Sequence, residues 1–177
     1  MKKRYLWLIV AAVVLLSVCI GVTLAFLVAK PVTVENTFAV GNVEITLTET
    51  TGSTYKIIPG ATLDKDPTIT VLANSEDCWL FVKVEESSDF HLYCSYEIAQ
   101  GWTLMEGEKG VYYRQVSKAG TDTQIGILKD DCIRVFDTVT EERLKAMQTR
   151  PNLIFTAYAV QAEALATAED AWQALQE

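Results

Sequence analysis

Residues 57–85 constrain the fold most tightly, because turn residues alternate there with two strand patterns. Pro59 and Gly60 suit the central positions of a type II turn, since proline presets its φ and glycine accepts the positive φ that follows. Residues 67–72 and 78–85 then alternate with the period of two that a strand requires. A short polar turn joins the two segments, so the sequence predicts that they form an antiparallel pair.

The segment 78–85 is apolar on both of its faces. One face carries small and aliphatic side chains, those of Cys78, Leu80, Val82 and Val84. Trp79 and Phe81 make the opposite face apolar as well. Because a strand with one face in solvent would alternate apolar with polar residues, we expect another layer to cover this second face.

Further segments with strand patterns follow one another along the chain, separated by turn residues. The predicted strands span 37–49, 67–72, 78–85, 90–99, 102–105, 111–117, 124–128, 132–139 and 152–162. The last is the longest and is apolar on both faces, so we expect it to be central and buried. This spacing predicts an all-β fold, an antiparallel sandwich with only minor helices.

Two short helices are expected near the C-terminal end. Thr138 and Glu141 have the spacing of a capping box, which predicts a helix near 141–148. Thr167 is expected to cap a terminal helix over 168–175, whose first turn is acidic as the helix dipole favours.

The N-terminus has the features of an export segment. Three basic residues precede an uncharged apolar run over 6–29, which is typical of a signal peptide or a membrane helix. A small-x-small tripeptide favours cleavage after Ala25; a second site ends at Ala29, and a retained anchor stays open. The expected organisation is therefore a signal peptide over 1–25, an extended segment over 26–36 and a β-sandwich domain over 37–177.

Composition and motifs argue against several functions. The formal net charge is −8, and an acidic surface repels nucleic acid. His91 is the only histidine and no HExxH motif occurs, whereas a zinc peptidase needs two histidines one helical turn apart. Acidic pairs such as Asp130–Asp131 lack the spacing of a calcium-binding EF-hand loop and fit solvated turns. We therefore predict no catalytic site, no metal site and no cofactor.

The cysteines leave two hypotheses open. Cys19 lies in the apolar N-terminal run, and Cys78, Cys94 and Cys132 follow it. Cys78 and Cys94 lie on strands expected to be neighbours, which favours a disulfide between them. The alternative is three reduced, buried thiols that act as small hydrophobic side chains.

The order of several segments resembles a known family. These segments are 36–45 (NTFAVGNVEI), 58–60 (IPG), 65–68 (KDPT), 78–84 (CWLFVKV), 101–103 (GWT), 111–114 (VYYR), 153–162 (LIFTAYAVQA) and 168–172 (AEDAW). Together they are similar to the camelysin/TasA-type group of exported proteins of Gram-positive bacteria. The N-terminal run resembles the signals that SipW-type signal peptidases process. The resemblance implies a jelly-roll-like β-sandwich with a cell-surface or biofilm-matrix role, in a protein that is secreted, or held in the membrane if the signal is retained.

The same resemblance implies a mode of assembly. Subunits of TasA-type members form fibres in which an N-terminal segment is donated to the neighbouring subunit. The corresponding segment here is 26–37, and the sheet-completing residues would be Phe26, Leu27, Val32 and Val34 within it and Phe38 directly after it. The implied partners are further copies of the chain, a signal peptidase during export and other matrix proteins.

Two other functions stay open. A monomeric surface module could bind a glycan or a protein partner through its aromatic residues, and an exposed Trp79 or Trp102 would favour it. Camelysin-like proteins are also classed as metallopeptidases, an activity that the single histidine disfavours.

Overall fold

The computed structural model describes residues 42–52, 55–147 and 150–176. These residues belong to one compact unit, Val40–Glu177, which is mostly β. Its strands form three antiparallel sheets. The predicted fold class is therefore confirmed at the level of a mostly β chain with antiparallel sheets.

Each sheet is named here after its central or longest strand. The β4 sheet has the order β10 (Leu153–Gln161), β4 (Cys78–Glu86), β7 (Val111–Val116) and β6 (Thr103–Leu104). The β3 sheet has the order β1 (Ile45–Thr48), β3 (Thr68–Val71) and β8 (Thr123–Gly126). The β9 sheet has the order β2 (Thr62–Asp64), β9 (Cys132–Val135) and β5 (Cys94–Ser95).

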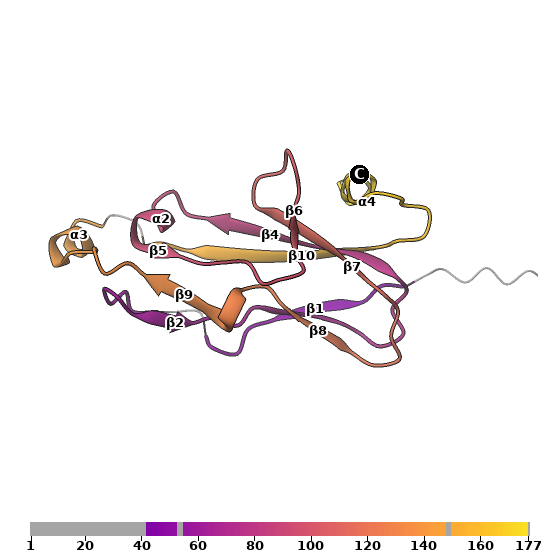
Figure 1. The fold of residues 1–177 in the computed structure, drawn as a ribbon, viewed down its shortest axis with the longest axis horizontal. Coiled ribbons are helices and arrows are strands. Elements are labelled where there is room, and N and C mark those ends of the chain that lie inside the picture. The colour runs from indigo at the N-terminus through magenta and orange to yellow at the C-terminus, as the bar shows by residue number, and fades with distance from the viewer. Residues whose placement is uncertain (1–41, 53–54, 148–149, 177) are drawn as a thin grey trace, which may run out of the picture. The chain divides into compact units, whose positions relative to one another are not determined.

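The β4 sheet forms one layer, and the β3 and β9 sheets together form the layer that faces it (Figure 1). The chain runs from β2 into β3 and from β8 into β9, and the pairing in each sheet extends toward the other sheet: Ile127 N donates to Pro67 O at 3.0 Å beyond the β3–β8 pair, and Lys65 N donates to Asp131 O at 2.7 Å beyond the β2–β9 pair. A 3-10 turn, η1 (Lys129–Asp131), lies between β8 and β9. The second layer is therefore almost continuous from one sheet to the next.

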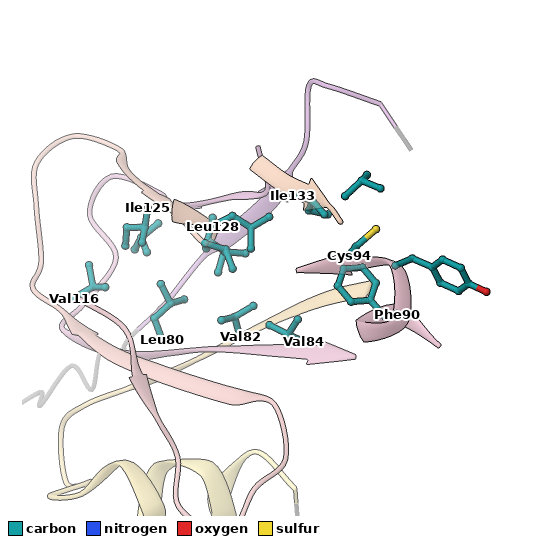
Figure 2. Close-up of a cluster of buried hydrophobic side chains, with 14 of the residues drawn as sticks. Leu80, Val82, Val84, Phe90, Cys94, Val116, Ile125, Leu128 and Ile133 are labelled. Carbon is teal, nitrogen blue, oxygen red and sulfur yellow. The ribbon is translucent and has the colours of Figure 1, made fainter. Parts of the chain in front are cut away.

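The main core fills the space between the layers. Leu80, Val82 and Val84 of β4 point toward Ile125 and toward Leu128 and Ile133 beyond it (Figure 2). Leu80 and Val82 are fully buried. The alternation of 78–85 therefore placed the inner face of β4 correctly.

A second, smaller core covers the outer face of the β4 sheet. Trp79 and Phe81 pack there with Trp172 of helix α4 (Ala168–Ala174). The Phe81 and Trp172 rings lie 5.2 Å apart, and Tyr158 of β10 lies 5.4 Å from Trp172. The predicted cover on this face is confirmed, and it is the C-terminal helix, capped by Thr167 as expected.

Local turn chemistry was also predicted correctly at Pro59–Gly60. Ala61 N donates to Ile58 O at 3.0 Å, and Gly60 has a φ of 75°, as the third position of a type II turn requires. The other short helix, α3 (Glu141–Lys145), also forms, but its N-cap is Thr140 rather than Thr138. The side chain of Thr140 accepts a hydrogen bond from Arg143 N.

The prediction that 67–72 and 78–85 pair with each other is wrong. β3 pairs with β1 and β8, whereas β4 pairs with β10 and β7. The polar residues between the two strands lead the chain from one layer to the other, and Asn74 among them has a φ of 67°. Both strands have buried side chains, and crossing between layers lets those side chains face each other across one core.

Two further strand predictions need correction. Residues 90–99 form a short helix, α2 (Phe90–Tyr93), and then the two-residue strand β5, rather than one strand. The last predicted strand exists as β10 but lies at the edge of its sheet instead of the centre. The outer face of β10 is apolar because helix α4 covers it. An apolar pattern on both faces therefore shows that both faces are covered, but not that the strand has a neighbouring strand on each side.

Candidate functional site

The most unusual feature of the described surface is the free edge of β10. Ser87 N donates to Asn152 O at 3.1 Å, and Ala162 N donates to Asp77 O at 2.7 Å. The even-numbered residues of β10 therefore direct their backbone N–H and C=O groups toward β4. Hydrogen bonding alternates along an antiparallel strand. The odd-numbered residues therefore direct their backbone N–H and C=O groups away from β4, namely Leu153, Phe155, Ala157, Ala159 and Gln161.

Nothing in the sequence of β10 protects this edge. The strand reads LIFTAYAVQ and contains no charged residue, proline or glycine. Natural proteins usually blunt an exposed edge with lysine, proline or a bulge, because unpaired backbone groups recruit further strands. Ile154 adds an exposed apolar side chain on this strand, with 51% of its surface accessible.

Strand β1 lies closest to β10 in the opposite layer (Figure 1). Among the described residues no ladder connects β1 to β10, and β1 is itself the edge of the β3 sheet. Thr46, Leu47 and Thr48 of β1 are exposed. Two free edges therefore border the same side of the sandwich.

A cavity of about 810 Å³ opens at the Leu153 end of β10. Its lining comes from both layers and from α2 and α3, and is mostly apolar. The apolar members are Tyr55, Ile57, Ile58, Leu63, Phe90, Cys94, Ile133, Leu144, Met147, Pro151 and Leu153. Its charged members are all basic, namely Lys56, Lys65 and Arg150. A cavity of this kind accepts apolar side chains and tolerates an acidic group at its rim.

Lys65, which lines this cavity, contacts residues from three segments of the chain. It is 6% exposed, and its Nζ lies 2.7 Å from Glu49 Oε1. Its ammonium group also lies 5.4 Å from the Tyr55 ring centroid and 5.6 Å from that of Phe155 on β10. This cation therefore links the segment after β1 to the inner face of β10.

Most of the residues that the sequence assigned to assembly lie outside the described part of the chain. This holds for the cleavage residue Ala25, with the alternative Ala29, and for the donated residues Phe26, Leu27, Val32, Val34 and Phe38. Their assigned roles stay predictions. The free edge of β10, in contrast, was not identified from the sequence, although the strand's lack of charge was a usable signal.

The predicted disulfide between Cys78 and Cys94 is not formed in this structure, where both are free and buried. Its premise is wrong, because β4 and β5 are not neighbouring strands. Cys78 begins β4 opposite Val116, whereas Cys94 lies beside Phe90 near the Val84 end (Figure 2). Cys132 is half-buried and also free.

His91 lies at the surface of α2, next to a carboxylate rather than a nucleophile. Its side chain is 68% exposed, and its Nε2 lies 2.5 Å from Oε2 of Glu86. Glu86 also accepts a hydrogen bond from Tyr96. Burial, and then this carboxylate, raise the pKa of Tyr96 well above its ordinary value. Tyr96 therefore stays a neutral donor to Glu86.

The acidic pairs noted in the sequence do not converge. Within the described ranges no group of three or more His, Cys, Asp and Glu side chains is placed to hold a metal ion. Asp66 instead accepts hydrogen bonds from the backbone and hydroxyl groups of Thr50 and Thr51. These bonds hold the pKa of its carboxyl well below its usual value, with the Thr50 hydroxyl contributing most.

The aromatic residues divide between core and surface. Trp79 is buried and donates from Nε1 to Leu165 O at 3.0 Å. Phe81 is fully buried, and Tyr113 packs beside both rings. Trp102 is half-buried and packs against the main core.

Comparison of the chain with protein-family models, with curated proteins and with solved structures gave no match. The resemblance to the camelysin/TasA-type group therefore stays a prediction. In the part of the chain that the structure describes, no helix is both long and apolar enough to cross a membrane. The apolar run over 6–29 lies outside that part.

Proposed function

We propose that this chain is an exported, non-enzymatic structural subunit of a bacterial cell surface or extracellular matrix. Copies assemble into fibres by adding a strand to the free edge of β10. The observation that carries the proposal is this edge, which is nine residues long, uncharged and, among the described residues, unpaired on one side. Jelly-roll connectivity, export through a cleaved signal and membership of the camelysin/TasA-type group are parts of the same proposal.

In this mechanism the donor is segment 26–37 of a neighbouring copy. An extended donor pairs with the outward N–H and C=O groups of β10, and these main-chain hydrogen bonds supply affinity without a sequence-specific motif. Val32, Val34 and Phe38 share one face of an extended chain. That face suits the apolar cavity next to Leu153.

The first test places a charge at the acceptor edge. Ile154→Lys should prevent fibres while leaving the monomer folded, because the replaced side chain is half exposed and lysine blunts strand edges. Leu104→Lys is the matched control, since Leu104 is 56% exposed on β6 at the opposite edge of the same sheet. Residues 26–177 of each variant would be followed over time by size-exclusion chromatography and negative-stain electron microscopy.

A second test removes the donor. Deleting 26–35 should abolish fibres and leave the circular-dichroism spectrum and thermal midpoint of the monomer unchanged. Unaltered fibres after this deletion would refute donation by this segment, and unaltered fibres with Ile154→Lys would refute β10 as the acceptor.

A monomeric surface-binding module is the second candidate. Trp79 is buried and Trp102 is half-buried against the main core, so neither is the exposed indole expected for this function. What favours it is the polar groove beside Trp102, whose ring centroid lies 5.7 Å from Cζ of the groove residue Arg114. A chain that stays monomeric at all concentrations and binds a ligand through that groove would support this reading over assembly.

A further inference from the structure

Arg114 points into the space between the two layers although nothing there neutralises it. It lies opposite Leu80 on β4, and its neighbours on the same face of β7 are Tyr112 and Val116, which pack against the main core. Arg114 forms no ion pair with any carboxylate of the described residues. An inward arginine without a carboxylate is costly unless some other anion compensates it.

The guanidinium also contains an unsatisfied donor. Arg114 Nε is buried and has no hydrogen-bond partner in the described structure. Buried polar groups are nearly always paired, and the exceptions often mark the site of a ligand or ion.

Two neighbours hold this guanidinium in place. Its Cζ lies 5.7 Å from the ring centroid of Trp102, whose own Nε1 donates to Gly126 O on β8 at 2.9 Å. Gly101 leaves room for the group, because a Cβ at that position would lie 3.2 Å from Nη1. The arginine is therefore pre-positioned, which lowers the entropy cost of binding an anion.

A groove of about 440 Å³ runs past Arg114 between β7 and β8. Its polar lining residues are Gln100, Gln115, Gln124, Ser117, Thr123 and Arg114. Of these, Arg114 and Thr123 lie on the strand faces that look into the space between the layers, whereas Gln115 and Gln124 alternate with them along β7 and β8. No acidic residue lines it, although the chain contains 23 of them. The groove is thus polar, hydrogen-bonding and positive within an acidic protein.

We propose that this groove binds an acidic sugar residue, with its carboxylate on Arg114. A guanidinium matches a carboxylate with two parallel hydrogen bonds. Amide and hydroxyl groups both donate and accept, as sugar hydroxyls do, so the amide and hydroxyl residues beside this one cation fit a hydroxylated ring with one acidic group. An acidic peptide offers the carboxylate but fewer hydroxyl partners. The site lies on the β7–β8 side and does not depend on strand addition at β10.

The test uses the full chain in mild detergent and isothermal titration calorimetry with trigalacturonate. The neutral methyl ester of the same trisaccharide is the matched ligand control. Because a charge-assisted bidentate contact is lost, the ester should bind at least about tenfold more weakly. Arg114→Gln should cause a similar loss, and Arg114→Lys a smaller one because lysine keeps the charge but not the fork.

Arg134→Gln is the matched protein control. Arg134 is an exposed arginine on β9, so this variant changes the net charge equally and should leave the affinity unchanged. Thr123→Val, at a half-buried position on the same face of β8 as Ile125, gives a second variant if Arg114→Gln does not fold, with an expected loss of about threefold.

Three results would overturn the proposal. They are no binding of trigalacturonate by the wild-type chain, equal binding of the ester, and unchanged affinity in folded Arg114→Gln or Thr123→Val. Tighter binding of triglutamate than of trigalacturonate would also overturn it, by showing a site for acidic peptides.

Discussion

At the scale of single residues, backbone geometry and burial decide which side chains tolerate change. Gly110 has a φ of 71°, and its carbonyl accepts a hydrogen bond from Val84 N at 2.8 Å. A Cβ at this position would lie 2.3 Å from Val84 O. The close approach of the β6–β7 turn to β4 therefore depends on the absence of a side chain.

Replacing Gly110 with alanine should lower the free energy of unfolding by more than about 2 kcal/mol, because the clash with backbone adds to the strain of a positive φ. Gly107→Ala is the control, since Gly107 has a φ of 81° but no atom within 4 Å of its Cβ position. It should cost only about 1 kcal/mol. Urea denaturation would compare the two, and equal losses would contradict the argument from close packing.

We expect the thiols of Cys78, Cys94 and Cys132 to differ in reactivity, because they differ in burial. Burial, and then the charge of Asp77, raise the pKa of Cys78 to about 11, and burial also raises the pKa of Cys94. Only the thiolate is alkylated at an appreciable rate. At pH 8 we expect iodoacetamide to label the half-buried Cys132 in the native protein, and Cys78 and Cys94 only after unfolding.

Peptide mapping by mass spectrometry after brief labelling would measure this order. The same map without reductant tests the disulfide predicted from the sequence. A Cys78–Cys94 crosslink in the native protein would contradict the placement of these residues on strands that are not neighbours.

At the scale of elements, the C-terminal helix explains why β4 and β10 are apolar on both faces. Helix α4 has only seven residues, too few to be stable alone, so its docking on the β4 sheet holds it. Trp172 is 8% exposed and packs against Phe81 and Tyr158. The indole nitrogen of Trp172 is buried and finds no partner among the described residues.

Trp172→Ala should therefore destabilise the protein by about 3–5 kcal/mol, since it removes a buried ring and leaves a cavity. Trp172→Phe should cost much less, less than about 1.5 kcal/mol, because it keeps an aromatic ring and removes an unsatisfied donor. Thermal or urea unfolding would measure both. A phenylalanine variant as unstable as the alanine variant would show that the indole nitrogen has a partner, such as a bound water.

At the scale of the whole molecule, charge opposes self-association while the β10 edge favours it. The net charge is −8, so copies repel one another at separations up to about the Debye length. Strand addition relies on backbone hydrogen bonds and apolar contacts, which salt does not weaken in the same way.

Fibre growth should accordingly become faster when the ionic strength rises from about 0.01 M to about 0.15 M, where the Debye length falls from about 30 Å to about 8 Å. Light scattering with electron microscopy at each salt concentration would follow it. Fibres that dissolve as salt is added would mean that complementary charges, rather than the strand edge, hold the copies together.

The sequence predicted well whatever depends on side-chain periodicity. Alternation along 78–85 assigned each side chain of β4 to the correct face, Pro59–Gly60 gave the correct turn, and Thr167 gave the correct helix cap. These features are local: each depends on residues within one or two turns or strands of the position concerned.

Only the tertiary structure decided which strands are neighbours and which edges are free. The pattern in 67–72 and 78–85 shows that each strand has a buried face. That pattern is the same whether the two strands pair within one sheet or lie in opposite sheets and face each other across the core. The backbone hydrogen-bonding groups are the same in every residue except proline, so the sequence of β10 does not say which strand lies beside it. The free edge of β10 and the inward Arg114 both follow from that long-range arrangement, which is why neither could be identified from the sequence alone.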